Sequence, residues 1–313
     1  MKKLFLLLAL AFALPMTVSA QYEEDEEEVV DDEVISAEDD EDSNEEVVDG
    51  IVRKQHIKAK KPLMPAYVRE ANVLWSKTIW RILDLRQKQN LYLYYPTEDI
   101  DERKSLARTL FDAVQEGEIS AYSPNAANEF DEKWTPLQVY EQLMKGSGVS
   151  EEDYEGLDSV VTTNPETGKE EVHYVIQTTA QNFTEIRQIK VKEVWFFDKR
   201  YGRMDVRIIG VCPVTFVEKN GSKFSFDLFW IYYPEAAGVL SRQEAYSYRN
   251  DAQRISLRDK LETRQFDSYI FRESNVYNNR VISAIASNGI DQNMEAQNIQ
   301  ANIFQHEHDM WEY

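Results

Sequence analysis

The chain has 313 residues, of which 42% are hydrophobic, so it can bury one or two ordinary cores. Its formal charge of −21 is concentrated near the start, because the stretch from Gln21 to Asp49 carries 17 acidic residues and no Lys or Arg. Lys2 and Lys3 precede that stretch, so the residues after Asp49 carry only −6. This mildly acidic remainder lacks the positive footprint that nucleic-acid binding requires, and we expect no nucleic-acid partner.

The N-terminal residues predict export. Residues 1–3 are Met-Lys-Lys, residues 4–14 form a short apolar run, and residues 18–20 are suited to a cleavage site. This is the pattern of a secretory signal peptide over residues 1–20. The apolar run is too short for a convincing membrane anchor, and no later stretch approaches the length of a membrane span.

Residues 21–62 are predicted to be an acidic, disordered tail and linker. The tail has too little apolar surface to offset the entropy of ordering its backbone. A change of charge at residues 58–61, followed by Pro62 and Pro65, marks the start of an ordered domain that we place at residues 63–313.

The domain is predicted to begin with helices. Apolar residues at steps of three, four and seven predict an amphipathic helix from about residue 68 to residue 89. The residues of this stripe are Val73, Leu74, Ile79, Trp80 and Leu83. The aromatic run at residues 91–95 predicts a short strand that Pro96 ends.

Two further helices are predicted before residue 147. One begins at residues 99–101, carries the stripe Leu106, Leu110 and Val114, and is stopped by Gly117. The other begins at Thr135, which forms a capping box with Gln138, and ends at Gly146. We expect residues 146–168 to be a mobile surface loop and residues 173–176 to be a short strand.

The central prediction is an antiparallel sheet over about residues 186–233. Three strands are expected at residues 189–197, 204–213 and 224–233, because apolar side chains alternate along each of them. The third strand is apolar on both faces towards its end, which indicates a covered position. Asn220-Gly221 supplies the strongest hairpin signal in the chain. Cys212, the single cysteine, permits no internal disulfide, and we interpret it as a buried apolar residue of the second strand.

Helices are predicted again after the sheet. Ser241 and Glu244 resemble a capping box that opens a short helix, and Ser256 with Asp259 opens a longer one. A third helix is expected around residues 281–285 with its end near Gly289, and a polar helix begins at about residue 293. The predicted fold class is therefore α+β, with a central antiparallel sheet at about residues 186–233 flanked by helices from both sides of the sequence.

No residue pattern in the chain indicates catalysis. There is no glycine-rich phosphate loop and no nucleophile elbow, and the lone cysteine has no evident histidine partner. His306 and His308 are the only two of the four histidines that lie close together, and a polar C-terminal end explains them better than a metal site does. We therefore expect no catalytic residues, no cofactor and no metal.

Two alternative functions remain open at this level. One is a secreted hydrolase, which would use a pair of buried carboxylates that a sequence cannot reveal. The other is a calcium-buffering protein, but its acidic tail lacks the ligand spacing and the glycine of a high-affinity loop.

Aromatic residues make up 12% of an otherwise polar chain. Such side chains are enriched at protein interfaces because they offer large contact areas with few rotatable bonds. The candidates for a partner interface are Trp75, Trp80, Tyr94, Tyr95, Trp195, Tyr277, Trp311 and Tyr313. Among these, Trp80 and Trp195 fit a core position better.

Several blocks of the chain, taken together and in their order, form a recognisable pattern. One block begins Trp75-Ser-Lys-Thr-Ile-Trp80, and another is Trp195-Phe-Phe-Asp198. The blocks are residues 75–86, 94–96, 111–122, 195–198, 204–213, 228–236, 250–254, 264–266, 273–277 and 307–311. In these blocks the chain resembles the GldN/PorN family of gliding-motility and type IX secretion proteins. The resemblance runs from about residue 68 to the end, and the long acidic tail departs from the family pattern.

This resemblance implies a non-enzymatic structural subunit in the periplasm. Family members are similar to ring subunits that pair with an outer-membrane lipoprotein, GldK/PorK, and communicate with the inner-membrane motor components GldL and GldM. The protein would then lie at the inner face of the outer membrane through its partner. Ring closure requires two different, complementary faces on each subunit, which bind head to tail.

Overall fold

The structure is a computed structural model. In it the chain forms two units, Met1–Val52 and Arg53–Tyr313. It describes residues 61–98, 100, 103–125, 129–146, 183–219, 221–247 and 254–310, together with four separate strands. These strands are β1 (Val47–Val48), β2 (Val52–Arg53), β6 (Asp158–Thr163) and β7 (Glu170–Val175). The predicted signal peptide and most of the predicted tail and linker lie outside the described residues. In the part of the chain that is described, no helix combines the length and the apolar character needed to cross a bilayer.

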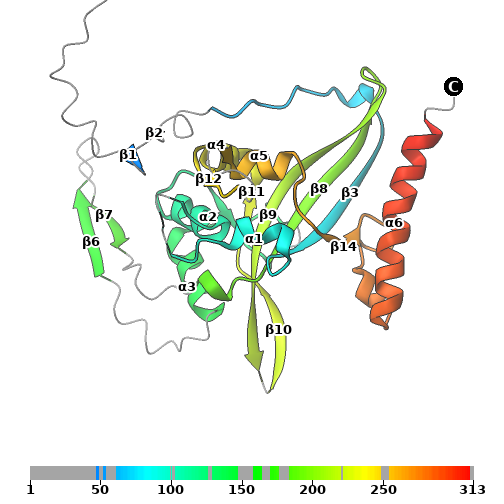
Figure 1. Cartoon of the computed structure of the whole chain (residues 1–313). Coiled ribbons are helices and arrows are strands. Elements are labelled where there is room, and N and C mark those ends of the chain that lie inside the picture. The colour runs from blue at the N-terminus through cyan, green and yellow to red at the C-terminus, as the bar shows by residue number, and fades with distance from the viewer. Residues whose placement is uncertain are drawn as a thin grey trace, which may run out of the picture. The chain divides into compact units, whose positions relative to one another are not determined.

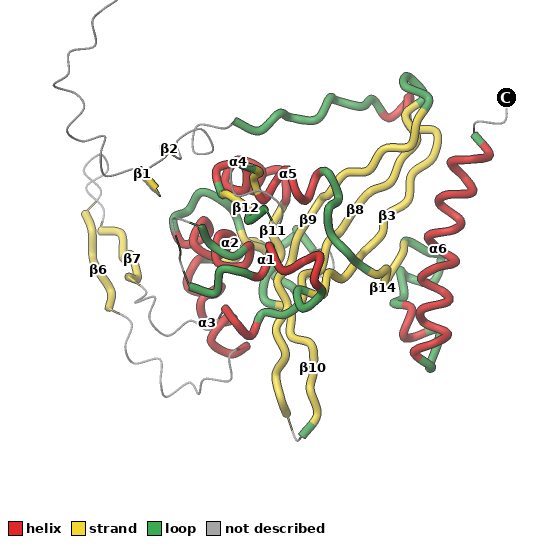
Figure 2. Tube along the Cα trace, in the orientation of Figure 1, coloured by secondary structure: helices red, strands yellow, loops and turns green. Residues whose placement is uncertain are grey.

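One large antiparallel sheet organises the second unit (Figures 1 and 2). Its strands run in the order β14-β3-β8-β9-β11-β4-β5, and β10 pairs with β9 beside this path. The strands are β3 (Val73–Asp84), β4 (Ala121–Tyr122), β5 (Lys133–Trp134), β8 (Gln188–Asp198), β9 (Arg203–Lys219), β10 (Ser222–Asp227), β11 (Trp230–Tyr232) and β14 (Tyr269–Glu273). The predicted α+β class with a central antiparallel sheet is confirmed.

The helices come from both sides of the central strands in the sequence. They are α1 (Leu91–Tyr94), α2 (Leu106–Gln115), α3 (Pro136–Gly146), α4 (Tyr233–Arg242), α5 (Leu257–Glu262) and α6 (Gly289–Asp309). Single 3-10 turns lie at Glu70–Asn72, Lys88–Asn90, Phe183–Glu185 and Ile282–Ala284, and the short strands β12 (Glu244–Ala245) and β13 (Ile255–Ser256) pair with each other.

The predicted helix at residues 68–89 is wrong, because this segment forms the strand β3. Along β3 the side chains of Ile79, Arg81 and Leu83 share one face, and their partners on β8 include Glu193 and Ile189. Arg81 is only 4% exposed, so a charged residue occupies an inward position of the strand. That buried charge interrupts the apolar alternation, and the remaining apolar residues happen to fit a helical period.

Other local predictions also fail. Residues 91–95 form the one-turn helix α1 instead of a strand. The box at Ser241 lies at the end of α4 instead of opening a helix, and the helix expected at residues 281–285 is a single 3-10 turn. Residues 158–163, predicted as part of a loop, form β6, which pairs with β7.

The helix signals that depend on caps are mostly confirmed. Thr135 N donates to Gln138 Oε1 at 2.8 Å, which is the predicted capping box of α3. Ser256 Oγ accepts a hydrogen bond from Asp259 N at 3.1 Å and caps α5. The last helix, α6, is longer than expected because it begins at Gly289 rather than near residue 293.

The strands predicted at 189–197 and 204–213 are confirmed as β8 and β9. The strand predicted at 224–233 is divided into β10 and β11, because β9 extends to Lys219 and holds them at different places along its length. Between them, Leu228 N donates to Pro213 O at 3.0 Å, and Leu228 and Phe229 turn into the core. Figure 1 shows that the β9–β10 hairpin projects beyond the rest of the sheet.

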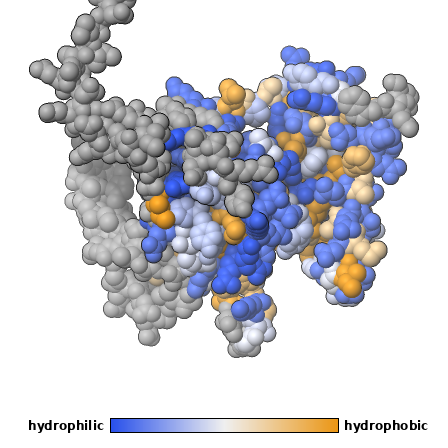
Figure 3. Space-filling view, in the orientation of Figure 1, coloured by the Kyte–Doolittle hydropathy of each residue, from blue (hydrophilic) through white to orange (hydrophobic). Residues whose placement is uncertain are grey.

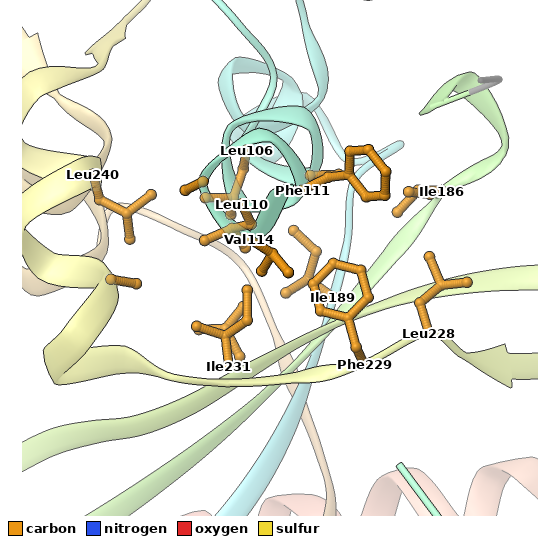
Figure 4. Packing of buried hydrophobic residues seen from close by; sticks show 14 of the residues in the cluster. Leu106, Leu110, Phe111, Val114, Ile186, Ile189, Leu228, Phe229, Ile231 and Leu240 are labelled. Atoms are coloured by element: carbon orange, nitrogen blue, oxygen red, sulfur yellow. The ribbon is translucent and has the colours of Figure 1, made fainter. Parts of the chain in front are cut away.

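The first face of the sheet carries the main core. Helices α1 to α5 cover this face, and Leu110 and Val114 of α2 point towards Ile189 of β8 and Ile231 of β11 (Figure 4). Further along the same face of β3, Ile79 packs with Ile299 and Ile303 of α6 and with Ile270 of β14. The two apolar clusters are therefore separate, and Arg81 lies between Ile79 and Leu83.

The opposite face carries a third cluster, made of Trp80, Tyr122, Cys212, Val214 and Trp230. Its members come from β3, β4, β9 and β11, and Phe130 packs against them. Cys212 is fully buried, as its place in the strand predicted.

Candidate protein-interaction surfaces

Glu193 of β8 is the most deeply buried carboxylate of the described sheet, with an exposed fraction of 0%. Its oxygens accept hydrogen bonds from Arg81 Nε at 3.1 Å, from Arg264 Nη1 at 2.8 Å and from Trp195 Nε1 at 3.1 Å. Two guanidinium groups and one indole thus satisfy a single carboxylate. Removing one partner from such a site would leave uncompensated charge in a low-dielectric environment.

The same cluster connects the sheet to α6. Arg81 Nη1 lies 3.4 Å from Gln300 Oε1 of α6, and the guanidinium of Arg264 lies 5.2 Å from the ring centroid of Trp195. Burial lowers the pKa of Arg81, the charge of Glu193 opposes this change, and the charge of Arg264 adds to it. The Glu193 cluster therefore joins the main core to the α6 cluster by polar contacts.

A second carboxylate, Glu129, lies on the other face of the sheet. It accepts hydrogen bonds from Trp80 Nε1 and Lys192 Nζ, each at 2.8 Å, and Arg272 Nη1 lies 3.7 Å away. The guanidinium of Arg272 stands 4.3 Å from the ring centroid of Trp80. Burial would raise the pKa of Glu129, but its bonds to Lys192, its own backbone and Trp80 outweigh that effect, so the pKa lies below its ordinary value.

These two carboxylates do not form the pair that a glycosidase requires. Lys192 and Glu193 are neighbours on β8, so their side chains leave the strand on opposite faces. Glu129 binds Lys192 and therefore lies on the face opposite to Glu193. Each carboxylate is already bound by cations within its own cluster. Within the described ranges, no group of three His, Cys, Asp or Glu side chains is arranged to hold a metal ion.

Two of the hollows in the described surface have a defined lining. One, of about 250 Å³, lies between α2 and α4, where Asp112 pairs with Lys104 and Glu118 pairs with Arg242. The other, of about 290 Å³, is lined by residues of β3, β8 and β9, most of them apolar, and by Val68 before β3. In the first hollow Asp112 and Glu118 are each paired with a cation, and the lining of the second contains no carboxylate and no histidine.

The tryptophans proposed for a partner interface lie mainly within the domain. Trp80 is buried, with an exposed fraction of 4%, and Trp195 is partly buried beside Glu193. Trp75 is also partly buried, and its ring centroid lies 4.7 Å from that of His306 on α6. Trp75 and Trp195 thus meet at the α6 cluster, whereas Trp311 lies outside the described residues.

The proposed tyrosines are more accessible. Tyr95 and Tyr277 are 52% and 62% exposed, while Tyr94 packs against the main core and donates its hydroxyl to Thr184 O at 2.9 Å. Tyr94 and Tyr95 form an edge-to-face ring contact at 4.9 Å. Tyr277 lies apart from them, after β14, and Tyr313 is outside the described residues.

Exposed apolar side chains on α6 and on the segment before it were not singled out by the sequence analysis. Figure 3 shows apolar surface in this region. The residues are Val276 (89% exposed), Ile285 (57%), Ile290 (68%), Met294 (57%) and Phe304 (69%). The sequence did contain a signal for this surface: Ile290, Met294 and Phe304 recur at helical spacing in a segment rich in Asn and Gln.

A second accessible surface is formed by residues 61–69. Leu63 and Tyr67 are 85% and 79% exposed. Their backbone is held to the domain, because Arg258 Nη2 donates to Leu63 O at 2.6 Å and Arg200 Nη2 donates to Tyr67 O at 3.2 Å. Arg207 donates in the same way to Ala66 O. The segment is thus fixed through its carbonyls while its apolar side chains face outward.

These features define an α+β protein built on one antiparallel sheet, with internally paired charges and apolar side chains at its periphery. Residues 68–312 match the family described as "Gliding motility associated protein GldN", and this chain belongs to that family. The match covers the resemblance predicted from residue 68 onward. Among curated proteins, none was found to match the chain.

Proposed function

We propose that this protein is a non-enzymatic structural subunit of the type IX secretion and gliding machinery. After export by its signal peptide it acts in the periplasm, at the inner face of the outer membrane. There it forms a ring-like assembly with a GldK/PorK-like lipoprotein and communicates with GldL/GldM-like motor components. Membership of the GldN family supports the link to gliding.

The observation that carries the proposal is the placement of exposed apolar groups on separate parts of the domain. Leu63 and Tyr67 lie on the N-terminal segment, Phe224 lies on the β9–β10 hairpin, and Tyr277 follows β14. Large apolar side chains left exposed at several places indicate several binding surfaces. A ring subunit that also binds a lipoprotein requires at least three: two for its neighbours and one for its partner.

The hydrolase alternative gains no support from the arrangement of the two carboxylates described above, one buried and one partly buried. Glu129 and Glu193 lie on opposite faces of the sheet and are bound by Lys192, Arg81 and Arg264. A retaining or inverting glycosidase would need two carboxyl groups that face the same substrate.

The test is co-expression of the full chain with a GldK/PorK-like lipoprotein, followed by affinity purification, size measurement and electron microscopy. We expect a large assembly that contains both proteins and that forms only when both are present. The variant Tyr277→Ala should reduce the yield of assembly, whereas Tyr201→Ala, at a similarly exposed tyrosine of the β8–β9 turn, serves as the matched control. Separate elution of the two wild-type proteins would count against the proposal.

A further inference from the structure

Helix α6 carries a continuous seam on its outer side. Its positions are Ile290, Met294, Gln297, Ala301, Phe304 and His308, which follow one another at steps of four and three. This is the spacing at which one helix packs along another in a coiled coil. All six residues are exposed, and Ile299 and Ile303, on the opposite side of the helix, are buried against the sheet. The inner side therefore fixes the helix, and the seam is left without a partner within the described residues.

The residues beside the seam have the composition of an interface. Between Gln292 and Gln305 the helix contains a single charged residue, Glu295, and is otherwise rich in Asn and Gln. A solvated helix face usually carries many charged side chains. Interfaces are depleted of Lys, Glu and Asp, so this outer side is unusual for free surface.

We propose that a second copy of this chain packs its α6 antiparallel along this seam. In the antiparallel register whose midpoint lies at the level of Ile299, every seam residue meets a seam residue of the other copy. Met294 meets Phe304 of the second copy, where sulfur–aromatic contact is favourable. Gln297 meets Ala301 of the second copy, and Ile290 meets His308 of the second copy.

Charge supports the antiparallel arrangement. Beside the seam, Asp291 lies near Gln305 of the second copy, and Glu307 lies near Asn293 of the second copy. No two like charges face each other, although the helix carries four carboxylates and no Lys or Arg. Antiparallel packing also places the positive end of each helix dipole beside the negative end of the other. In a parallel pair, His308 would instead face His308 of the second copy.

The size of the contact indicates a weak association. From Ile290 to His308 the seam spans about 27 Å at the helical rise per residue. A helix pair of this length lies at the low end of specific interfaces. The contact is isologous, whereas the proposed ring uses head-to-tail contacts, so it does not depend on the proposed function.

The first experiment measures self-association of the full chain, purified without partners, by sedimentation equilibrium. We expect a dimer whose dissociation constant rises at least about 100-fold in Met294→Glu/Phe304→Glu, because two unpaired charges would enter the seam of each copy. The control variant, Val276→Glu/Asn302→Glu, adds the same charges at exposed positions away from the seam and should dimerise normally. Since all four positions are exposed, far-ultraviolet circular dichroism should show unchanged folding.

The second experiment fixes the orientation by disulfide cross-linking. In a Cys212→Ala background, a mixture of Met294→Cys and Phe304→Cys chains should form cross-linked heterodimers. Each variant alone should not, because antiparallel packing keeps identical positions about 15 Å apart along the helix. A chain that stays monomeric, a double-glutamate variant that dimerises normally, or cross-linking of Met294→Cys chains with each other would each overturn the proposal.

Discussion

Lys192 and Glu193 are neighbours on β8, and their charged side chains lie on opposite faces of the sheet. Lys192 binds Glu129 on one face, and Glu193 binds Arg81 and Arg264 on the other. The sheet therefore carries an ionic cluster on each face, and the two clusters lie at adjacent positions of β8. On the first face the Glu193 cluster joins two separate apolar clusters, and on the second the ionic cluster of Glu129 holds the segment after residue 128 against Trp80.

The Glu193 cluster should be essential for stability. Glu193→Gln leaves two guanidinium groups near a neutral amide in a buried site, and we expect the free energy of unfolding to fall by about 3–5 kcal/mol. Urea denaturation followed by tryptophan fluorescence measures this change. Glu118→Gln removes a comparable pair with Arg242 at the surface and should cost less than about 1 kcal/mol. Equal losses in the two variants would contradict the structural role of Glu193.

Glu129 should make stability depend on pH. Its folded-state pKa lies below the ordinary value, so its contribution is fully present above the unfolded pKa and is lost as the pH falls through the folded pKa. Glu129→Gln should therefore be less stable than the wild type at neutral pH, and the difference should shrink on acidification below about pH 4. Denaturation curves at several pH values test this. A difference that stays constant or grows towards acidic pH would show that the assigned direction is wrong.

Two glycines should respond in opposite ways to a methyl group. A Cβ at Gly210 would lie 2.5 Å from Phe130 Cζ, so Gly210→Ala should force that ring aside and destabilise the protein by about 1–3 kcal/mol. Gly238 in α4 has no atom within 4 Å of its added Cβ, and Gly238→Ala should stabilise by about 0.5–1 kcal/mol. Thermal unfolding measures the midpoint temperature of each variant against that of the wild type. A higher midpoint for Gly210→Ala would refute the close packing of Phe130 against Gly210 of β9.

The thiol of Cys212 should be unreactive in the folded protein. The side chain is fully buried, and burial raises its pKa well above the ordinary value, so the reactive thiolate is scarce. Mass spectrometry after maleimide treatment should show no adduct on native protein and complete labelling in denaturant. Rapid labelling of native protein would place Cys212 at an accessible site instead.

Local signals in the sequence predicted much of the fold. The capping boxes at Thr135 and Ser256 depend on side chains three residues apart, so they are readable from the chain alone. The alternation along β8 and the first part of β9 was equally clear. The same reasoning failed at β3, where an inward-facing Arg81 concealed the alternation. No neighbour in sequence explains a buried guanidinium there, because its carboxylate partner lies on another strand.

The candidate surfaces were less predictable. Aromatic content pointed to Tyr95 and Tyr277, which are exposed, but also to Trp80, which is buried in the third cluster, as its better fit to a core position suggested. The large apolar area of an aromatic side chain suits a buried core position as well as a protein interface. Composition therefore does not show which of the two an aromatic residue occupies. Leu63 and Tyr67 gave no periodic signal at all, since their segment is held by backbone carbonyls.

The sequence by itself determined the class of fold, the cap-defined helices, the two long central strands and the burial of Cys212, because these follow from short-range patterns. Only the tertiary structure decided which side of α6 faces inward. Both sides carry apolar residues, and hydrophobicity alone does not choose between Ile299 with Ile303 and Met294 with Phe304. The choice depends on Ile79 and Ile270, which belong to strands distant in sequence and reach α6 only once the sheet has formed.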